Sequence, residues 1–123
     1  MIPVGTLVGT LAGVYPIGYA HSVEIFETRQ FSKWLKDLRD RQAKARIIAR
    51  LRIIATTGSL TGDVKALGDG VVELRFHVGP GYRVYAIQED ARLLILLVGG
   101  DKSTQQRDIN NAKLLAKEWK DEH

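Results

Sequence analysis

Cysteine is missing from this chain of 123 residues, and only three prolines occur. Without cysteine the protein can form neither disulfides nor thiolate metal sites, and it has no thiol nucleophile. The three histidines, His21, His77 and His123, are far apart, and no group of histidine and carboxylate residues has metal-ligand spacing. We therefore expect no metal and no cofactor. The absence of thiols suits a reducing compartment, so we expect the protein in the cytoplasm.

Lysine and arginine are missing from residues 1–22, although the whole chain has 18 of them against 14 acidic residues. This segment is rich in glycine, and Gly18 and Ala20 stand where small residues precede a signal-peptidase site. A signal peptide normally begins with positive charge, however, and glycines and prolines interrupt any run that could span a membrane. We interpret residues 1–22 as an extension outside the core domain, either disordered or an added edge strand, and residues 23–123 as the domain.

Positive charge is concentrated in residues 29–52, with nine basic and two acidic side chains. Such a local field favours an anionic partner, either nucleic acid or an acidic protein. The alternative is a solvated helix face without a partner. From this stretch we select Arg46 and Arg50 as candidate RNA contacts.

Hydrophobic spacing predicts two helices in the first half of the domain. Apolar residues recur at helical intervals from Phe31 to Leu38 and again from Ile47 to Ala55. Thr28 and Asp40 are placed to cap the starts of these helices, and Gly58 is placed to end the second. A first strand precedes them, because apolar and polar residues alternate in residues 23–26.

The second half of the domain is predicted to contain three strands and a last helix. Residues 59–70 indicate a loop because of their glycines and aspartates, and Val71–Gln88 indicates a hairpin turning at Gly79-Pro80-Gly81. The apolar run Leu93–Val98 is typical of a central strand, and Ser103–Gln106 matches a capping box. The order is β-α-α-β-β-β-α, an α+β domain in which an N-terminal helical hairpin and a C-terminal helix pack on a small antiparallel sheet.

Polar side chains gather on one face of the predicted hairpin. With Val78 opposite Tyr82, the register places His77 across from Arg83 and Arg75 across from Tyr85. The other face is apolar and covers a core. Two guanidiniums, an imidazole and a phenol on one face predict a phosphate-binding patch, because the guanidinium fork matches phosphate oxygens. The alternative is that these arginines are solvent-facing scaffold.

Three motifs then carry a resemblance to a known family: Glu73-Leu74-Arg75, GPGYRVY at residues 79–85 and GGDKSTQQRDI at residues 99–109. From Val23 to its end, the chain resembles the RelE superfamily of toxin–antitoxin toxins, closest to the HigB-like addiction module killer proteins. The resemblance implies a ribosome-dependent mRNA endoribonuclease that uses the RNA 2′-OH as nucleophile and needs no metal. It also implies a cognate antitoxin, a HigA-like DNA-binding protein, together with the ribosome and mRNA as partners, and no membrane.

The resemblance assigns roles to four basic residues. Arg75 and Arg83 match the strand arginines of the family, Lys102 is near the basic residue that follows its last strand, and Lys65 corresponds loosely to residues before its hairpin. The catalytic tyrosine or histidine of the family's last helix is missing here.

The side-chain chemistry also suggests which residues could accept and donate protons. His77 titrates nearest neutrality and is the best acid–base candidate, with Lys65 or Lys102 as donors and Asp108 as a further acceptor. Tyr85 could stack on a base or bond a phosphate. The alternative function is a non-catalytic module that binds RNA or protein through the same basic face.

Overall fold

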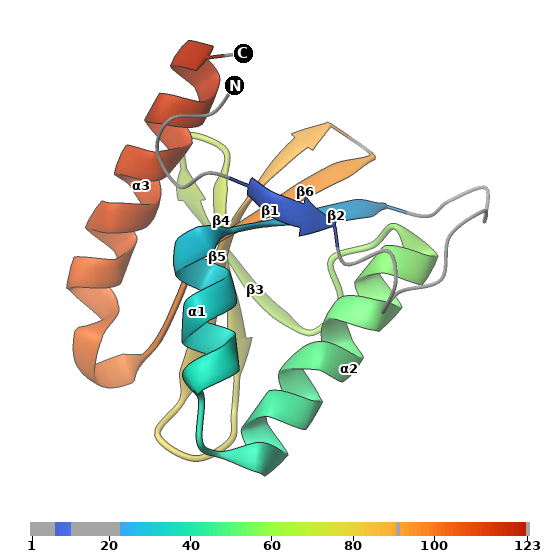
Figure 1. The fold of residues 1–123 in the computed structure, drawn as a ribbon, viewed down its shortest axis with the longest axis vertical. Helices are drawn as coiled ribbons and strands as arrows, with labels where there is room; N and C mark the ends of the chain where they lie inside the picture. The colour runs from blue at the N-terminus through green and yellow to red at the C-terminus, as the bar shows by residue number, and fades with distance from the viewer. Residues whose placement is uncertain (1–6, 11–22, 91, 123) are drawn as a thin grey trace.

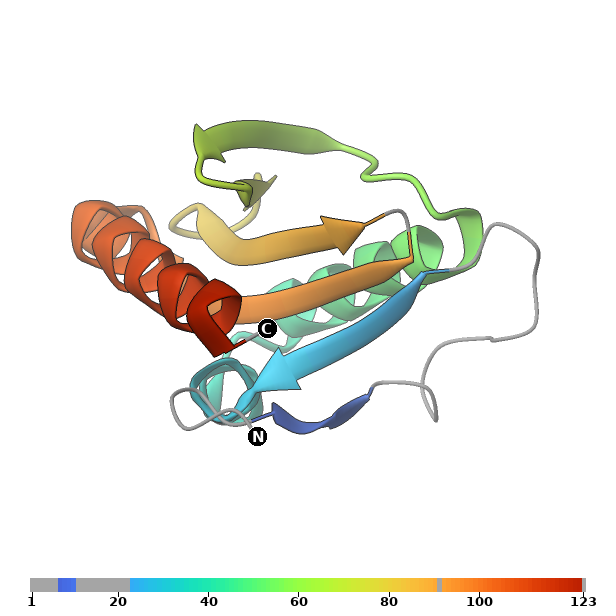
Figure 2. The same ribbon diagram turned by 90° about the horizontal axis from the view of Figure 1, so that it is seen from above.

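The computed structural model describes residues 7–10, 23–90 and 92–122, which form one sheet with helices on both faces (Figures 1 and 2). The elements are β1 (Leu7–Thr10), β2 (Glu24–Thr28), α1 (Arg29–Asp37), α2 (Arg41–Thr57), β3 (Asp63–Gly68), β4 (Val71–Phe76), β5 (Tyr82–Asp90), β6 (Leu93–Asp101), a 3-10 turn (Lys102–Thr104) and α3 (Gln105–Glu122). Within these segments no helix combines the length and apolar character that crossing a membrane requires.

The sheet is mixed, with the strand order β1-β2-β6-β5-β4-β3. The α+β class is confirmed, but the purely antiparallel sheet is wrong, because β2 and β6 run parallel. A parallel neighbour needs a long crossover, and here α1, α2 and three strands supply it. The predicted element order is also incomplete, since it lacks the two edge strands that Figure 2 shows at opposite sides of the sheet.

Of the two edge strands, β3 was not predicted, whereas β1 was one of the two alternatives for residues 1–22. β3 occupies the predicted loop of residues 59–70 and pairs antiparallel with β4. Its glycines stand at the ends of the strand, where Gly62 and Gly68 have φ of 84° and 89°, so they mark turns rather than a continuous loop. β1 pairs with β2, in agreement with the edge-strand alternative for the first segment. Gly18 and Ala20 lie outside the described residues.

Two hydrophobic cores lie on opposite faces of the sheet. Central strand β6 contributes to both, because Leu94 and Leu96 pack with α1 and α2 while Ile95 and Leu97 pack with α3. The prediction that this run is covered on both faces is therefore confirmed. The outcome is a sheet in which each face is covered by a different part of the chain.

The predicted helix caps are confirmed for the first two helices. Thr28 Oγ1 accepts a hydrogen bond from the Phe31 amide at 3.1 Å, and Asp40 Oδ1 accepts one from the Ala43 amide at 3.0 Å. Gly58 ends α2 in the left-handed region with φ of 74°. These caps fix the ends of α1 and α2 by satisfying free backbone amides.

The predicted capping box before α3 is wrong. Asp101 provides the cap instead, because its Oδ1 accepts hydrogen bonds from the Ser103 amide and hydroxyl at 2.8 and 2.5 Å. Gln106 bonds the Asn110 side chain one turn further along. A one-turn 3-10 helix precedes α3, which moves the cap two residues toward the N-terminus.

The hairpin register differs from the predicted one by two residues. Phe76 pairs with Tyr82 and Arg75 pairs with Arg83, so residues 77–81 form the turn. Within it, the Val78 amide donates to the Phe76 carbonyl and ends β4 early. Because a strand repeats every two residues, the apolar and polar faces stay as predicted.

The two tryptophans pack at helix–sheet contacts. Trp119 is buried in the α3 core and donates to Glu89 Oε2 at 2.9 Å. Trp34 is half-buried and lies directly on β6, where a Cβ added to Gly99 would be 2.1 Å from its ring. Gly99 therefore allows α1 to approach the sheet closely.

Gly99→Ala is expected to destabilise the protein by about 1–3 kcal/mol, because the methyl group overpacks the Trp34 ring. Urea unfolding measures this free energy of unfolding. In the Trp34→Leu background the same substitution should cost less, since the aromatic ring is gone. Equal costs in both backgrounds would rule out the ring as the cause.

Candidate functional site

A buried carboxylate, Glu73 of β4, organises the polar face of the sheet. Its Oε1 accepts a hydrogen bond from Arg75 Nε at 2.7 Å, and its Oε2 accepts one from Gln105 Nε2 at 2.9 Å. Arg83 Nε lies 3.9 Å from Oε2, a distance that makes this contact an ion pair without a hydrogen bond. Glu73 thus joins β4, β5 and the first residue of α3.

The charge of Glu73 is stabilised in spite of its burial. Burial alone would raise the pKa of Glu73, but hydrogen bonds from Arg75 and Gln105, the nearby Tyr85 hydroxyl and the Arg75 charge lower it below its ordinary value. Glu73 in turn raises the pKa of Arg75. The Glu73 carboxylate and the Arg75 guanidinium are therefore charged at neutral pH.

The two arginines lie side by side with their terminal nitrogens largely uncommitted. Arg75 and Arg83 are register partners on β4 and β5, and their side chains are 27% and 12% exposed. Glu73 engages the Nε atom of each. Arg83 Nη1 donates to the Gly81 carbonyl at 2.7 Å, whereas the Nη atoms of Arg75 have no hydrogen-bond partner in the described part of the chain. These groups provide N–H donors for an anion.

Tyr85 does not have the exposed position predicted for it. The side chain is fully buried in the core under α3, so in this structure it cannot stack on a base. Burial, followed by the charge of Glu73, raises the pKa of the Tyr85 phenol. The hydroxyl has no well-formed hydrogen bond among the described residues. It acts as a neutral neighbour of the Glu73 carboxylate.

Asp108 is also buried, at the start of α3. Its Oδ2 accepts a hydrogen bond from Thr104 Oγ1 at 2.6 Å, and a Cβ added to Gly100 would be 2.0 Å from Oδ2. Gly100 is the register partner of Arg83. The missing side chain therefore lets α3 begin directly beside the arginine pair.

Both candidate lysines are exposed at the border of this arrangement. Lys65 is the register partner of Glu73 on β3 and so lies on the same face of the sheet. Lys102 is in the 3-10 turn, where its Cβ would be 3.8 Å from a Cβ on Gly81, the residue whose carbonyl binds Arg83. The structure thus brings Lys65 and Lys102 to the surroundings of the arginine pair.

His77 lies beyond the end of β4 instead of opposite Arg83. Its Nε2 is 2.7 Å from Asp63 Oδ2, and its side chain is 77% exposed. Because residues 77–81 form the turn, the histidine is not held between two cations as the predicted register implied. It remains an exposed imidazole with a carboxylate partner.

The structure separates Arg46 and Arg50 from the arginine pair. Arg50 donates to the carbonyls of Thr61, Asp63 and Arg75 at 2.7, 2.9 and 2.5 Å, so its guanidinium is used to hold the backbone of β3 and β4. Its planar group also lies 4.7 Å from the Phe76 ring centroid. This arrangement gives Arg50 a structural role. Arg46 is exposed on α2, which packs on the opposite face from α3.

Sequence reasoning missed the central role of Glu73. The signal was present, because residues 73, 75, 83 and 85 share one face by alternation, and an acidic residue there would meet the arginines. The described residues contain no group of three histidine or carboxylate side chains suited to a metal ion. The site formed by Glu73, Arg75 and Arg83 instead provides fixed positive charge on a partly open surface.

Glu73→Gln is expected to lower stability at pH 7 by about 3 kcal/mol, because it leaves two guanidiniums beside an uncharged group. Folding lowers the pKa of the Glu73 carboxyl in the wild-type protein. The charged carboxylate therefore adds its full stabilisation above the unfolded-state pKa near 4.3, and this stabilisation is lost as pH falls through the folded-state pKa. The stability gap between the proteins should therefore narrow below about pH 4. Urea unfolding at pH 7 and pH 3.5 measures it, and a gap independent of pH would contradict the ion-pair role.

Comparison with known proteins identifies the family of the chain. Residues 33–120 match the family model of the phage-derived Gp49-like proteins (DUF891). A protein of Haemophilus influenzae, described as uncharacterized, is 47% identical over 97 residues, which cover 79% of this chain and 96% of that protein. The matched region contains α2, the whole arginine site and nearly all of α3. The chain belongs to the phage-derived Gp49-like family, a family of addiction-module toxins.

Proposed function

We propose that this protein is the toxin of a toxin–antitoxin module and acts as a ribosome-dependent mRNA endoribonuclease. The observation that carries the proposal is the pair Arg75 and Arg83, held on one sheet face by the buried Glu73 carboxylate. Membership of an addiction-module family supports the toxin role. The reaction is attack of an RNA 2′-OH on the adjacent phosphate, without a metal ion.

The arginine pair suits the charge that develops in this reaction. In the transition state negative charge accumulates on the non-bridging oxygens of the phosphate, and fixed N–H donors stabilise it without rearranging. Glu73 accepts a hydrogen bond from Arg75 Nε and forms an ion pair with Arg83 at 3.9 Å. Apart from Arg83 Nη1, which donates to the Gly81 carbonyl, the terminal nitrogens are left to meet oxygens. Because Glu73 is charged, one of the two positive charges remains in excess for the substrate.

Proton transfer is assigned to the exposed groups around the pair. Arginine is always protonated and is a poor base. His77 is exposed, and the Asp63 carboxylate orients its ring through one nitrogen and leaves the other free. Lys65 or Lys102 supplies the proton for the leaving 5′-oxygen. Tyr85 takes no part, because it is buried.

A non-catalytic binding module is the second candidate. The observation that favours it is the position of His77, which is paired with Asp63 beyond the end of β4 rather than between the arginines. Such a module would keep the basic face for RNA or protein and lack proton transfer. In either case the partners are a HigA-like antitoxin, the ribosome and mRNA, and exposed Arg46 on α2 is available to the antitoxin or the ribosome.

Replacing the arginines should remove cleavage while the fold persists. Primer extension on an mRNA in a purified translation reaction detects new 5′ ends, which should appear only when ribosomes are present. We expect Arg75→Ala or Arg83→Ala to lower the cleavage rate at least about 100-fold, the usual effect of losing one donor to a developing anion.

Two controls separate chemistry from stability. Each arginine variant strands the buried Glu73 charge, so each is also made with Glu73→Gln and followed by thermal unfolding. Arg92→Ala removes an exposed arginine at the β5–β6 turn and should cleave like wild type. Intact mRNA with wild-type protein, together with retained ribosome binding, would overturn the nuclease proposal and favour the binding module.

A further inference from the structure

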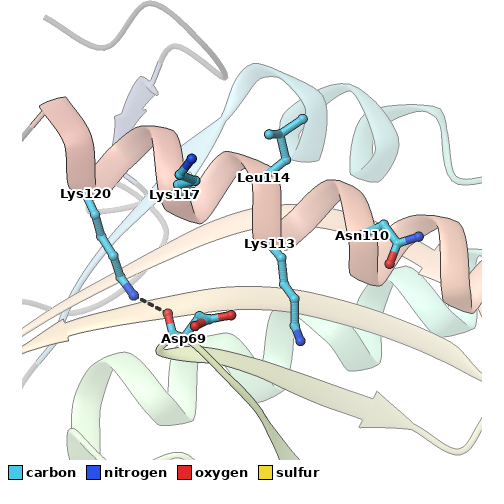
Figure 3. A pocket seen from close by; sticks show the side chains of 6 residues that line it. All are labelled: Asp69, Asn110, Lys113, Leu114, Lys117 and Lys120. Carbon is cyan, nitrogen blue, oxygen red and sulfur yellow. Dashed lines mark hydrogen bonds between the residues drawn. The ribbon is translucent and has the colours of Figure 1, made fainter.

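A second basic feature lies along α3, away from the arginine pair. A surface groove of about 530 Å³ separates the helix from the β3–β4 turn at Asp69 (Figure 3). Its lining residues are Asp69, Asn110, Lys113, Leu114, Lys117 and Lys120. Figure 3 shows Lys113 and Lys120 extending from α3 toward the sheet side, with Lys120 Nζ bonded to the Asp69 carbonyl. The groove therefore has a strongly cationic wall.

The charge on α3 is segregated by helical spacing. Gln106, Asn110, Lys113, Lys117 and Lys120 follow one another at intervals of four, three, four and three residues, so they form one stripe on the helix surface. This stripe contains three positive charges and no acidic residue. Asp108 is buried against β6. Asp121 follows Lys117 by four residues and so lies beside the C-terminal end of the stripe, and Asp69 lines the facing wall. The three lysines outnumber these two carboxylates, so the groove keeps an excess of positive charge that attracts a polyanion.

The groove and the arginine site lie along the same helix. The first residue of α3, Gln105, bonds Glu73, and near the other end Lys120 bonds the turn that joins β3 to β4. The helix therefore runs beside this hairpin, from the arginine pair to Asp69. Exposed Lys65 lies on the α3-facing side of the hairpin, opposite Glu73. The basic residues of the groove, Lys65 and the arginine pair therefore all lie along the contact between α3 and this hairpin.

We propose that this groove binds the phosphates of the RNA segment next to the phosphate held by Arg75 and Arg83, an inference that rests on the proposed function. Lys113 and Lys117 bind phosphate oxygens directly. Lys120 has three N–H donors and uses one on the Asp69 carbonyl, so two remain for the ligand. The path is sequence-independent, because ammonium groups meet only the backbone of the RNA.

The lining favours RNA over an acidic protein segment. Helices that dock in grooves depend on several apolar anchors at helical spacing. Here Leu114 is the one apolar residue among the lining side chains, and Figure 3 shows it pointing away from Asp69. The three lysines instead recur at intervals of about 6 and 4.5 Å along the helix axis and form a charged wall of the groove.

Binding of a 2′-O-methyl RNA tests the groove without requiring cleavage, because this RNA has phosphates but no free 2′-OH. Fluorescence anisotropy with a 12-nucleotide probe is measured from 0.05 to 0.4 M salt. Lys113→Gln/Lys117→Gln should weaken binding about 25-fold at 0.1 M salt and lower the salt slope by about 1.4, since two phosphate contacts are lost. A three-nucleotide probe should be affected much less.

The matched control is Lys36→Gln/Arg92→Gln, which removes two exposed charges outside the groove. Its affinity should stay within about twofold of wild type, because charges beyond a Debye length are screened. Equal losses in both double variants, or no loss in the groove variant, would overturn the groove proposal. So would unchanged RNA binding with loss of binding to a poly-glutamate peptide, which would identify an acidic protein as the occupant.

A cleavage measurement shows whether the groove proposal or the nuclease proposal is wrong. In the translation assay the groove variant should raise the RNA concentration needed for half-maximal rate and keep the rate at saturation. If wild type and variant differ in RNA binding but neither cleaves, the groove stands and the nuclease proposal falls. If wild type cleaves and the groove variant binds and cleaves identically, the groove proposal alone falls.

Discussion

The Glu73 carboxylate is buried where β4, β5 and α3 meet, and it must stay charged there. A buried charge is expensive unless partners surround it, so the two arginines and Gln105 are needed by the fold as well as by any ligand. This requirement explains why basic side chains lie on a face that α3 partly covers. The same contact sets the orientation of both guanidiniums.

Glycine positions allow this arrangement to form. Gly100 gives the Asp108 carboxylate room beside β6, and Gly99 accepts the Trp34 ring from the opposite face. Two adjacent residues of one strand thus receive one helix each, α3 on one side and α1 on the other. Because α3 starts this close to the sheet, its first residue reaches Glu73. Close packing in the strand therefore determines the geometry of the polar site.

Most of the local chemistry was predictable from the sequence, the capping box at Ser103 excepted, whereas partners distant in the chain were not. Caps at Thr28 and Asp40 depend on neighbouring amides, and the buried run of β6 depends on its own composition, so both were predicted correctly. The parallel pairing of β2 with β6 depends on a crossover and left no local signal. The structural role of Arg50 was not predictable either, because the three backbone carbonyls that it binds belong to residues distant from it in the chain.

The candidate site was predictable in part, because alternation survives an error of two residues in register. Arg75 and Arg83 were placed on one face under either pairing, and the true register brings them directly opposite each other. Tyr85 shares that face but lies under α3, and alternation alone cannot tell which part of a face a helix covers. The part of this polar face that stays open to solvent lies next to the first residue of α3, where the helix stops covering the sheet. Exposed Lys65 and Lys102 border it, so the extent of the open basic surface is set by the helix start rather than by the strands alone.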